Sequence, residues 1–190
     1  MIYLASKSPR RSDLLNQIGI NHQVVNIEID ETPRQQETPT DYVLRMAKEK
    51  ALQACSDEMT IPLLAADTSV ICEEKILGKP ENKEQFLEMF ELLNDNQHQV
   101  ITAVAVIKDT IQTSLSVSQV SFRKITPEEA LLYWETGEPR DKAGGYGIQG
   151  KAAIFINDIH GSYSGIMGLP LYETSELLAE FGVYSQYNKS

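Results

Sequence analysis

The chain has 190 residues, 42% of them hydrophobic and 23% charged, which is typical of a globular protein and excludes a largely disordered one. Its formal net charge of −10 argues against general binding to nucleic acid polymers, because such binding needs a basic face. No apolar stretch approaches the ~20 residues of a membrane helix, and the apolar start is too short for a signal peptide, so we expect a cytoplasmic protein with no membrane partner.

Short apolar strands and amphipathic helices alternate through the first half of the chain. In chain order we expect a strand at 2–5, a helix at about 9–18, a strand at 22–29, a helix from Thr38, a strand at 61–66, and a hairpin of 70–72 with 76–77. The helix from Thr38 places Val43, Ala47 and Ala51 on one face, at a spacing of four residues. The strand at 61–66 is apolar throughout and is expected to end at Asp67.

The second half continues the same pattern with longer strands. In chain order we expect a helix at 86–93, strands at 100–107 and 111–122, a helix after Thr126, a strand at 154–156 and a helix at 171–181. The strand at 100–107 is nearly all apolar, which suits a central strand buried on both faces. In 111–122 the apolar side chains change from odd to even positions, and a bulge at Ser118-Gln119 would keep both halves facing one core. The irregular alternation predicts an α/β fold with a mixed central β-sheet flanked by helices, as one domain over residues 1–190.

The first segment with chemical content is residues 6–11. Ser8 is suited to cap a helix that begins at Pro9, and two arginines, Arg10 and Arg11, follow. Two cations are unfavourable at a helix N-terminus unless an anion binds there, because the helix dipole favours negative charge at that end. Free backbone N–H groups, the hydroxyls of Ser6 and Ser8 and the guanidinium groups would then converge on a phosphate. A solvated surface helix is the alternative reading.

Two carboxylates are candidates for catalysis or metal binding. Asp67, followed by Thr68, comes directly after an apolar run. In open α/β sheets ligands gather at the carboxyl ends of strands, where a carboxylate can hold a metal or act as a base. Glu31 could supply the second carboxylate. An aspartate that caps a turn and an ordinary acidic loop residue are the alternatives.

Three lysines are candidates for binding an anionic substrate. Lys48 and Lys50 are two residues apart on one helix and point to different faces, so at most one of them should face a site. Lys79 lies between Gly78, which frees the backbone, and Pro80, which restricts it, so its side chain is presented rigidly. Ordinary exposure to solvent is the alternative for all three.

Two glycine-rich segments follow, at 141–150 and 161–170. Four glycines within 144–150 allow main-chain N–H groups to approach a ligand closely, and the amide of Gln149 can present a donor and an acceptor to a base edge. Neither segment contains the P-loop or the dinucleotide-binding fingerprint. Plain connecting loops are the alternative for both.

Taken together and in this order, these segments resemble the Maf family of nucleoside triphosphate pyrophosphatases. The resemblance spans nearly the whole chain and rests on residues 4–11, 66–68, 77–80, 141–150 and 161–170. It implies an ITPase-like α/β fold with two lobes around a substrate cleft, a divalent cation (Mg²⁺ or Mn²⁺) and a homodimer. It also implies hydrolysis of a small-molecule nucleoside triphosphate to the monophosphate and pyrophosphate. Ser164-Gly165 departs from the family pattern, in which an asparagine is expected nearby.

The resemblance also implies roles for individual residues. Asp67 would be catalytic, and Glu31 with Asp67 would hold the metal. The substrate would be bound by Ser6, Ser8, Arg10, Arg11, Lys50, Thr68, Lys79 and Gln149. Arg10, Thr68 and Gln149 are the residues of the branch that acts on dTTP and UTP, and modified pyrimidine nucleotides stay open as substrates.

Two readings from other functional classes stay open. A nucleotide-binding regulator of cell division or septum formation, without turnover, would keep the basic residues and have no need of Asp67. An interaction module would use the glycine-rich segments only as turns.

Overall fold

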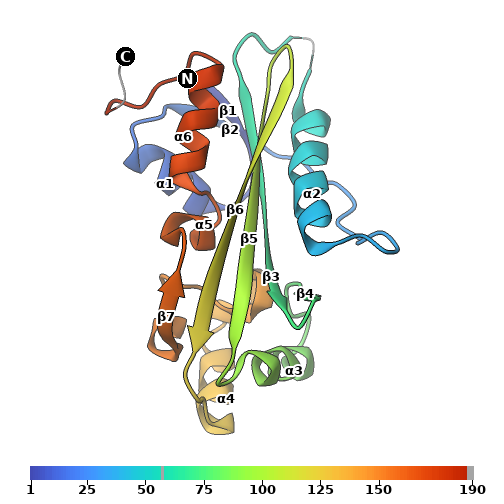
Figure 1. Ribbon diagram of the computed structural model, residues 1–190, viewed down its shortest axis with the longest axis vertical. Helices are drawn as coiled ribbons and strands as arrows, with labels where there is room; N and C mark the ends of the chain where they lie inside the picture. Colours follow the sequence, from blue (N-terminus) through green and yellow to red (C-terminus); the bar gives the residue numbers. More distant parts are fainter. Residues whose placement is uncertain (57, 188–190) are drawn as a thin grey trace.

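A seven-stranded mixed sheet runs along the length of the molecule (Figure 1). The computed structural model describes residues 1–56 and 58–187. The strand order is β2-β1-β3-β5-β6-β7, with β4 paired to β3 outside that order. The strands are β1 Ile2–Ala5, β2 His22–Val25, β3 Leu63–Cys72, β4 Lys75–Leu77, β5 Gln97–Ile107, β6 Ile111–Phe122 and β7 Ile156–His160. The β1–β2 and β1–β3 pairs are parallel and the others are antiparallel, so the predicted mixed sheet is confirmed.

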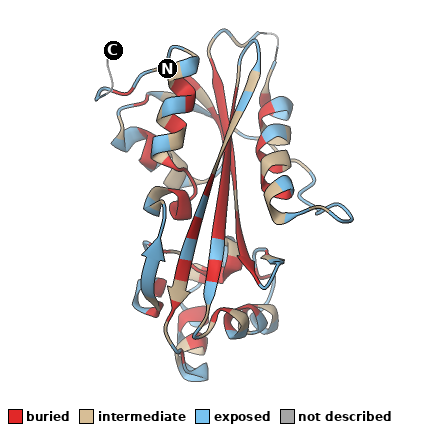
Figure 2. Ribbon diagram, in the orientation of Figure 1, coloured by how far each residue is buried: buried red, intermediate tan, exposed pale blue. Residues whose placement is uncertain are grey.

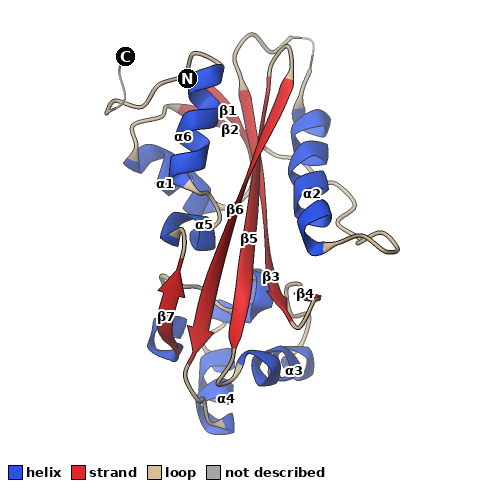
Figure 3. Ribbon diagram, in the orientation of Figure 1, coloured by secondary structure: helices blue, strands red, loops and turns tan. Residues whose placement is uncertain are grey.

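Helices cover both faces of this sheet (Figure 3). They are α1 Pro9–Gln17, α2 Pro39–Ala54, α3 Lys83–Leu93, α4 Pro127–Glu135, α5 Tyr163–Met167 and α6 Leu171–Glu180. Short 3₁₀ turns lie at Glu138–Asp141, Ala143–Gly145 and Lys151–Phe155. Among the described residues, none of the helices combines the length and hydrophobicity that crossing a bilayer requires.

Each face of the sheet has its own apolar core (Figure 2). The helix α2 packs Val43, Ala47 and Ala51, all fully buried, against Ala65 and Ala103 of the central strands, as the four-residue spacing predicted. The larger core on the other face gathers side chains from α1, α3, α4 and α6. Small residues in the first core let α2 approach the sheet closely, which brings its side chains to the middle of β3.

The bulge predicted at Ser118-Gln119 is wrong. Strand β6 pairs with β5 without interruption through this stretch, and the irregularity lies between Ser121 and Phe122, in the pairing with β7. The change of phase has a different cause: Leu115 contacts the core under α2, whereas Val120 belongs to the core on the opposite face. A regular strand serves both cores because its alternate side chains point to opposite faces.

The strand that was expected to end at Asp67 continues to Cys72. Its antiparallel pairing with β5 is unbroken, with Asp67 opposite Ala103 and Thr68 opposite Thr102. The other side of β3 differs, because β1 pairs with it only as far as Ala65 and β4 begins only at Val70. Residues 66–69 therefore lack a strand neighbour on that side within the described part of the chain. We refer to these four residues as the open edge of β3.

Several boundaries also differ from the sequence prediction. Strand β2 ends at Val25 rather than at residue 29, and Ile27 and Ile29 pack as loop residues against the core under α2. The strand expected at 154–156 begins only at Ile156, because Lys151–Phe155 form a 3₁₀ turn. The short helix α5 was not predicted, since two glycines flank it. The hairpin of β3 with β4 and the helices α2, α3, α4 and α6 are confirmed.

A buried histidine makes the stability of the fold depend on pH. His98 in β5 lies with Nε2 2.7 Å from the hydroxyl of Tyr146, and burial lowers the pKa of His98 to about 4. The unfolded chain, with an ordinary histidine, takes up this proton first as the pH falls. The contribution is therefore fully present above about pH 6.5 and is lost as the pH falls towards 4, by up to about 3 kcal/mol.

We expect His98→Gln to flatten the loss of thermal stability between pH 6.5 and pH 4. The measurement is Tm against pH for the wild type, for His98→Gln and for His160→Gln, whose side chain is exposed. His160→Gln should follow the wild-type curve. Parallel curves for the wild type and His98→Gln would show that His98 does not carry this dependence.

Candidate functional site

A cavity of about 780 Å³ opens at the open edge of β3. This volume is within the usual range for sites that bind small molecules. All ten residues to which the family resemblance assigns a role line it: Ser6, Ser8, Arg10, Arg11, Glu31, Lys50, Asp67, Thr68, Lys79 and Gln149. Lys48 is not among the lining residues, which agrees with the prediction that only one of the two lysines on α2 faces a site.

The strand topology explains why these residues meet. Ala5, the last residue of β1, is paired in parallel with Ala65 of β3. The segment that begins at Ser6 therefore leaves the sheet beside the open edge of β3. Ligand sites form at such points, where a parallel strand ends and its neighbour continues. The argument from strand ends was made for Asp67 and is wrong for it, because Asp67 lies inside its strand. The strand that does end at the site is β1, directly before residues 6–11.

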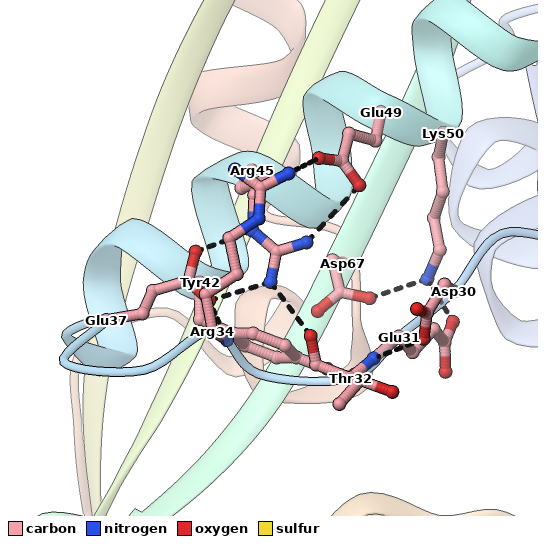
Figure 4. A network of polar contacts seen from close by, with 10 residues as sticks. All are labelled: Asp30, Glu31, Thr32, Arg34, Glu37, Tyr42, Arg45, Glu49, Lys50 and Asp67. Carbon is pink, nitrogen blue, oxygen red and sulfur yellow. Dashed lines mark hydrogen bonds and ion pairs between the residues drawn. The ribbon is translucent and has the colours of Figure 1, made fainter.

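On the face of the sheet covered by α2, two carboxylates share one lysine (Figure 4). The Nζ atom of Lys50 lies 2.6 Å from Oδ1 of Asp67 and 2.7 Å from Oε1 of Glu31. Burial acts to raise the pKa of Glu31, yet the net pKa lies below the ordinary value, since Lys50 donates a hydrogen bond to it and Lys79 and Arg11 attract its charge. Glu31 is thus held ionised although its side chain is only 48% exposed.

Side chains on α2 hold the loop that carries Glu31 (Figure 4). The hydroxyl of Tyr42 donates to the carbonyl oxygen of Glu31 at 2.8 Å, and Arg45 donates to that of Thr32 at 3.1 Å. Arg45 also donates to both carboxylate oxygens of Glu37, at 2.6 and 2.7 Å. Burial, reinforced by the negative charges of Asp67 and Glu31, raises the pKa of Tyr42 to about 12, so its hydroxyl stays a donor.

On the other side of the cavity, Arg11 is oriented by the protein itself. Its guanidinium donates to Oγ of Ser6 at 3.1 Å, to Oγ1 of Thr68 at 3.3 Å and to the carbonyl oxygen of Gly168 at 2.8 Å. Ser8 occupies the N-cap position of α1, as predicted, but its side chain accepts no capping hydrogen bond from the described residues. Its hydroxyl is therefore available to a ligand beside Arg11.

The glycine-rich segment 141–150 forms another wall of the cavity. Gly144 and Gly145 have φ values of +67° and +69°. A Cβ atom at Gly144 would lie 2.9 Å from the side chain of Val70, and one at Gly145 would lie 3.0 Å from the side chain of Phe86. Only glycine fits both the backbone angles and this packing. Gln149 is exposed at the cavity wall and has no hydrogen-bond partner among the residues that the structure describes.

Sequence reasoning missed several residues of the site. Tyr42 lines the cavity, and so does Lys142, whose Nζ lies 2.6 Å from Oδ1 of Asp141 and 2.8 Å from the carbonyl oxygen of Glu138. Arg45 was missed as well; it does not line the cavity but holds the loop that carries Glu31. For Arg45 a weak signal existed, since it forms an i,i+4 ion pair with Glu49 on α2, but nothing in the sequence connected it to the loop of Glu31.

The donor set fits a hard divalent cation that is held mainly by its substrate. Within residues 1–56 and 58–187, no group of three or more histidine, cysteine, aspartate or glutamate side chains could by itself enclose a metal ion. Glu31 and Asp67 nonetheless converge on one cation, the ammonium of Lys50. One or two carboxylates together with substrate phosphates are the usual environment of Mg²⁺ in enzymes that act on nucleotides.

Known proteins resemble this chain over nearly its whole length. The family model for Maf-like proteins matches residues 1–181. A dTTP/UTP pyrophosphatase of Alkalilimnicola ehrlichii is 47% identical over 96% of this chain and 93% of its own length. A dTTP/UTP pyrophosphatase of Colwellia psychrerythraea is 46% identical over 95% of this chain and 88% of its own length. Among solved structures, a HAM1 protein from Coxiella burnetii matches with a TM-score of 0.51 at 15% identity, covering 94% of this chain and 98% of that one, a likeness of fold alone.

Proposed function

The chain belongs to the family of Maf-like proteins, and on that premise we propose that it hydrolyses dTTP and UTP to the nucleoside monophosphate and pyrophosphate. The observation that carries the proposal is the single cavity that brings basic side chains, two carboxylates and Gln149 together at the open edge of β3. The relatives named dTTP/UTP pyrophosphatase, 46–48% identical to this chain, support the pyrimidine substrates.

Binding depends on a local concentration of positive charge in an acidic protein. Arg11, Lys50 and Lys79 neutralise the triphosphate, and the hydroxyl of Ser8 with the N-terminal N–H groups of α1 binds its oxygens. Phosphoryl transfer is accelerated mainly by positioning and charge stabilisation, so these groups contribute to turnover as well as to affinity.

Asp67 is assigned to the chemical step. It orients a water molecule and accepts its proton as the water oxygen bonds to the α-phosphorus. The bond from that phosphorus to the bridging oxygen breaks, and pyrophosphate leaves with the electron pair. A divalent cation, Mg²⁺ or Mn²⁺, held by Glu31 and Asp67 would act as a Lewis acid that stabilises the charge on the phosphate oxygens.

The alternative of a regulator that binds nucleotides without turnover gains no support from the site. Such a protein would need the basic residues but not two carboxylates that converge on Lys50. We also retain the homodimer and the cytoplasmic location as proposals, which light scattering and cell fractionation can test.

The decisive experiment measures pyrophosphate release across the common nucleoside triphosphates and modified pyrimidine nucleotides. We expect kcat/KM for dTTP and UTP to exceed the values for CTP, ATP and GTP. Absence of turnover with every nucleotide at saturating Mg²⁺ would contradict the enzymatic proposal, and a purine preference would contradict the assigned branch.

Gln149 is proposed to read the base. Uracil and thymine present an N3–H donor between two carbonyl acceptors, so one amide can pair with this edge in two places, whereas cytosine reverses part of the pattern. We expect Gln149→Glu to reduce the preference for UTP over CTP by about 1–3 kcal/mol, the scale of a good bidentate contact to a base. The measurement is kcat/KM for five nucleotides in the wild type, in Gln149→Glu and in Gln112→Glu, an exposed control on β6. Unchanged ratios in Gln149→Glu would show that Gln149 does not contact the base.

A further inference from the structure

The tight turn that carries Gln149 is held from behind the cavity wall. Residues 147–150 form this turn, which is closed by a hydrogen bond from the N–H of Gly150 to the carbonyl oxygen of Gly147 at 3.0 Å. Gln149 lies in the middle of the turn and is exposed at the cavity wall, whereas its neighbour Ile148 is buried in the larger core. Since Ile148 fixes one side of the turn, the direction of Gln149 depends on what holds the other side.

The other side of the turn is held by the carboxylate of Glu138. Its Oε2 atom accepts a hydrogen bond at 3.0 Å from the backbone N–H of Lys151, the residue directly after the turn. Its Oε1 atom accepts one from the hydroxyl of Tyr133 at 2.9 Å. Glu138 is partly buried and is not one of the described residues that line the cavity. The carboxylate therefore joins the turn to helix α4 from outside the cavity.

Tyr133 is a rigid anchor for this carboxylate. It is only 3% exposed, and the centroid of its ring lies 5.6 Å from that of Phe90 and 5.5 Å from that of Phe155. Burial, together with the hydrogen bond to Glu138, raises the pKa of Tyr133, so its hydroxyl stays a donor. Because a closely packed ring fixes where its hydroxyl lies, the carboxylate that accepts from it has one preferred position.

Gly150 leaves the space that this carboxylate occupies. A Cβ atom at Gly150 would overlap the carboxyl group of Glu138. The backbone angles of Gly150, φ −99° and ψ −155°, are extended, a conformation that other residues adopt. The carboxylate, rather than the backbone conformation, therefore requires a glycine at position 150.

We propose that Glu138 is a positioning residue for base selection, which fixes the turn so that the amide of Gln149 meets the edge of uracil or thymine. The inference rests on the proposed function, in which Gln149 reads the base. Hydrogen bonds weaken steeply away from their preferred geometry, so an amide on a fixed turn discriminates between two edges. An amide on a turn that is free to shift can adapt to either edge.

The test compares Glu138→Ala, which removes the carboxylate, with Glu138→Gln, which keeps its shape. In Glu138→Ala the turn can shift, and we expect the UTP/CTP ratio of kcat/KM to fall about 3- to 10-fold, a part of the value of a bidentate contact to a base. In Glu138→Gln the side-chain oxygen still accepts from Lys151 and the amide can donate to Tyr133, so the ratio should be kept. Glu135→Ala, at an exposed position of α4, is the matched control and should keep the ratio too. A loss of stability alone lowers both values of kcat/KM equally and leaves their ratio unchanged.

The overlap at Gly150 allows a second, independent measurement. Gly150→Ala should lower both the Tm and the UTP/CTP ratio, because the added methyl group displaces the carboxylate of Glu138 from Lys151. Adding Glu138→Ala removes the overlap, so the double variant should melt at a higher temperature than Gly150→Ala alone. Losses of Tm that simply add in the double variant would show that the carboxylate does not hold the turn, and would overturn the inference.

A double-mutant cycle with Gln149 separates this inference from the proposed function. If Glu138 acts through Gln149, Glu138→Ala in a Gln149→Ala background changes the UTP/CTP ratio no further. A further fall in that background, or equal losses for UTP and CTP in Glu138→Ala, would contradict the role of Glu138. Should Glu138→Ala fail to fold, Tyr133→Phe removes one anchor of the carboxylate and is read in the same way. An unchanged ratio in Gln149→Ala itself would instead contradict the proposed reading of the base.

Discussion

Replacing Asp67 by asparagine is expected to lower kcat at least ~10²-fold, the scale for losing a general base or a metal ligand. The carboxylate lies at the open edge of β3, 2.6 Å from the ammonium of Lys50, and is the most buried acidic group of the cavity. Asparagine has the same shape but can neither accept the proton of water nor carry the charge. Pyrophosphate release from dTTP at saturating Mg²⁺ measures the effect.

The fold should survive this change, which makes the loss of activity interpretable. Lys50 keeps its contact with Glu31 at 2.7 Å, and the pairing of residue 67 with Ala103 involves only the backbone. We expect a Tm close to that of the wild type and a normal rate for Asp158→Asn, an exposed aspartate on the edge strand β7. Near-normal turnover in Asp67→Asn would remove Asp67 from the chemical step.

The helices and the approximate composition of the site could be predicted from the sequence. In α2 the small residues Val43, Ala47 and Ala51 recur every four positions, and this local pattern is enough to predict a helix and its buried face. Eight of the ten site residues belong to the ordered motifs, and the order of those motifs predicted that they meet in one cavity without any knowledge of their distances. Glu31 and Lys50 lie outside the motifs, and their roles followed only from the family resemblance.

The course of β3 could not be predicted, because it depends on contacts far apart in the sequence. Polar residues after an apolar run indicate the end of a strand, and Asp67 and Thr68 fit that pattern. The strand continues because β5 pairs with it on one side. On the other side, residues 66–69 have no strand neighbour among the described residues, so the side chains of Asp67 and Thr68 both reach the cavity although they point to opposite faces of the strand. The periodicity of a single segment contains no information about either neighbour.

The same limitation explains the errors about β6 and the supporting residues. A change of phase within one strand has two physical causes, a bulge or two cores on opposite faces, and only the packing of α2 against Leu115 distinguishes them. Likewise Arg45 has the pattern of an ordinary residue on a helix surface. Its contact with the carbonyl oxygen of Thr32 joins residues 13 positions apart, and no local pattern predicts that contact.

Removal of divalent cations should abolish turnover, and this is the second large effect that we expect. Glu31 and Asp67 place two negative charges in the cavity that receives a highly charged triphosphate, while Lys50 contributes one positive charge to the pair. Without a cation, repulsion between these carboxylates and the phosphates weakens the binding of the substrate. The same repulsion opposes the negative charge that develops on the phosphate oxygens during the reaction. A dication must also displace Lys50 from at least one carboxylate, which frees its ammonium for the substrate.

We therefore expect excess EDTA to eliminate pyrophosphate release, and excess Mg²⁺ or Mn²⁺ to restore it. Glu31→Gln should raise the metal concentration needed for half-maximal activity and weaken the binding of Mn²⁺ measured by electron paramagnetic resonance. Glu28→Gln is the matched control, because Glu28 lies in the same loop but is exposed and paired with Lys7. Full activity after exhaustive chelation would exclude the metal site. Equal Mn²⁺ binding by Glu31→Gln and the control would remove Glu31 from it, since a ligand that holds the ion must change its affinity.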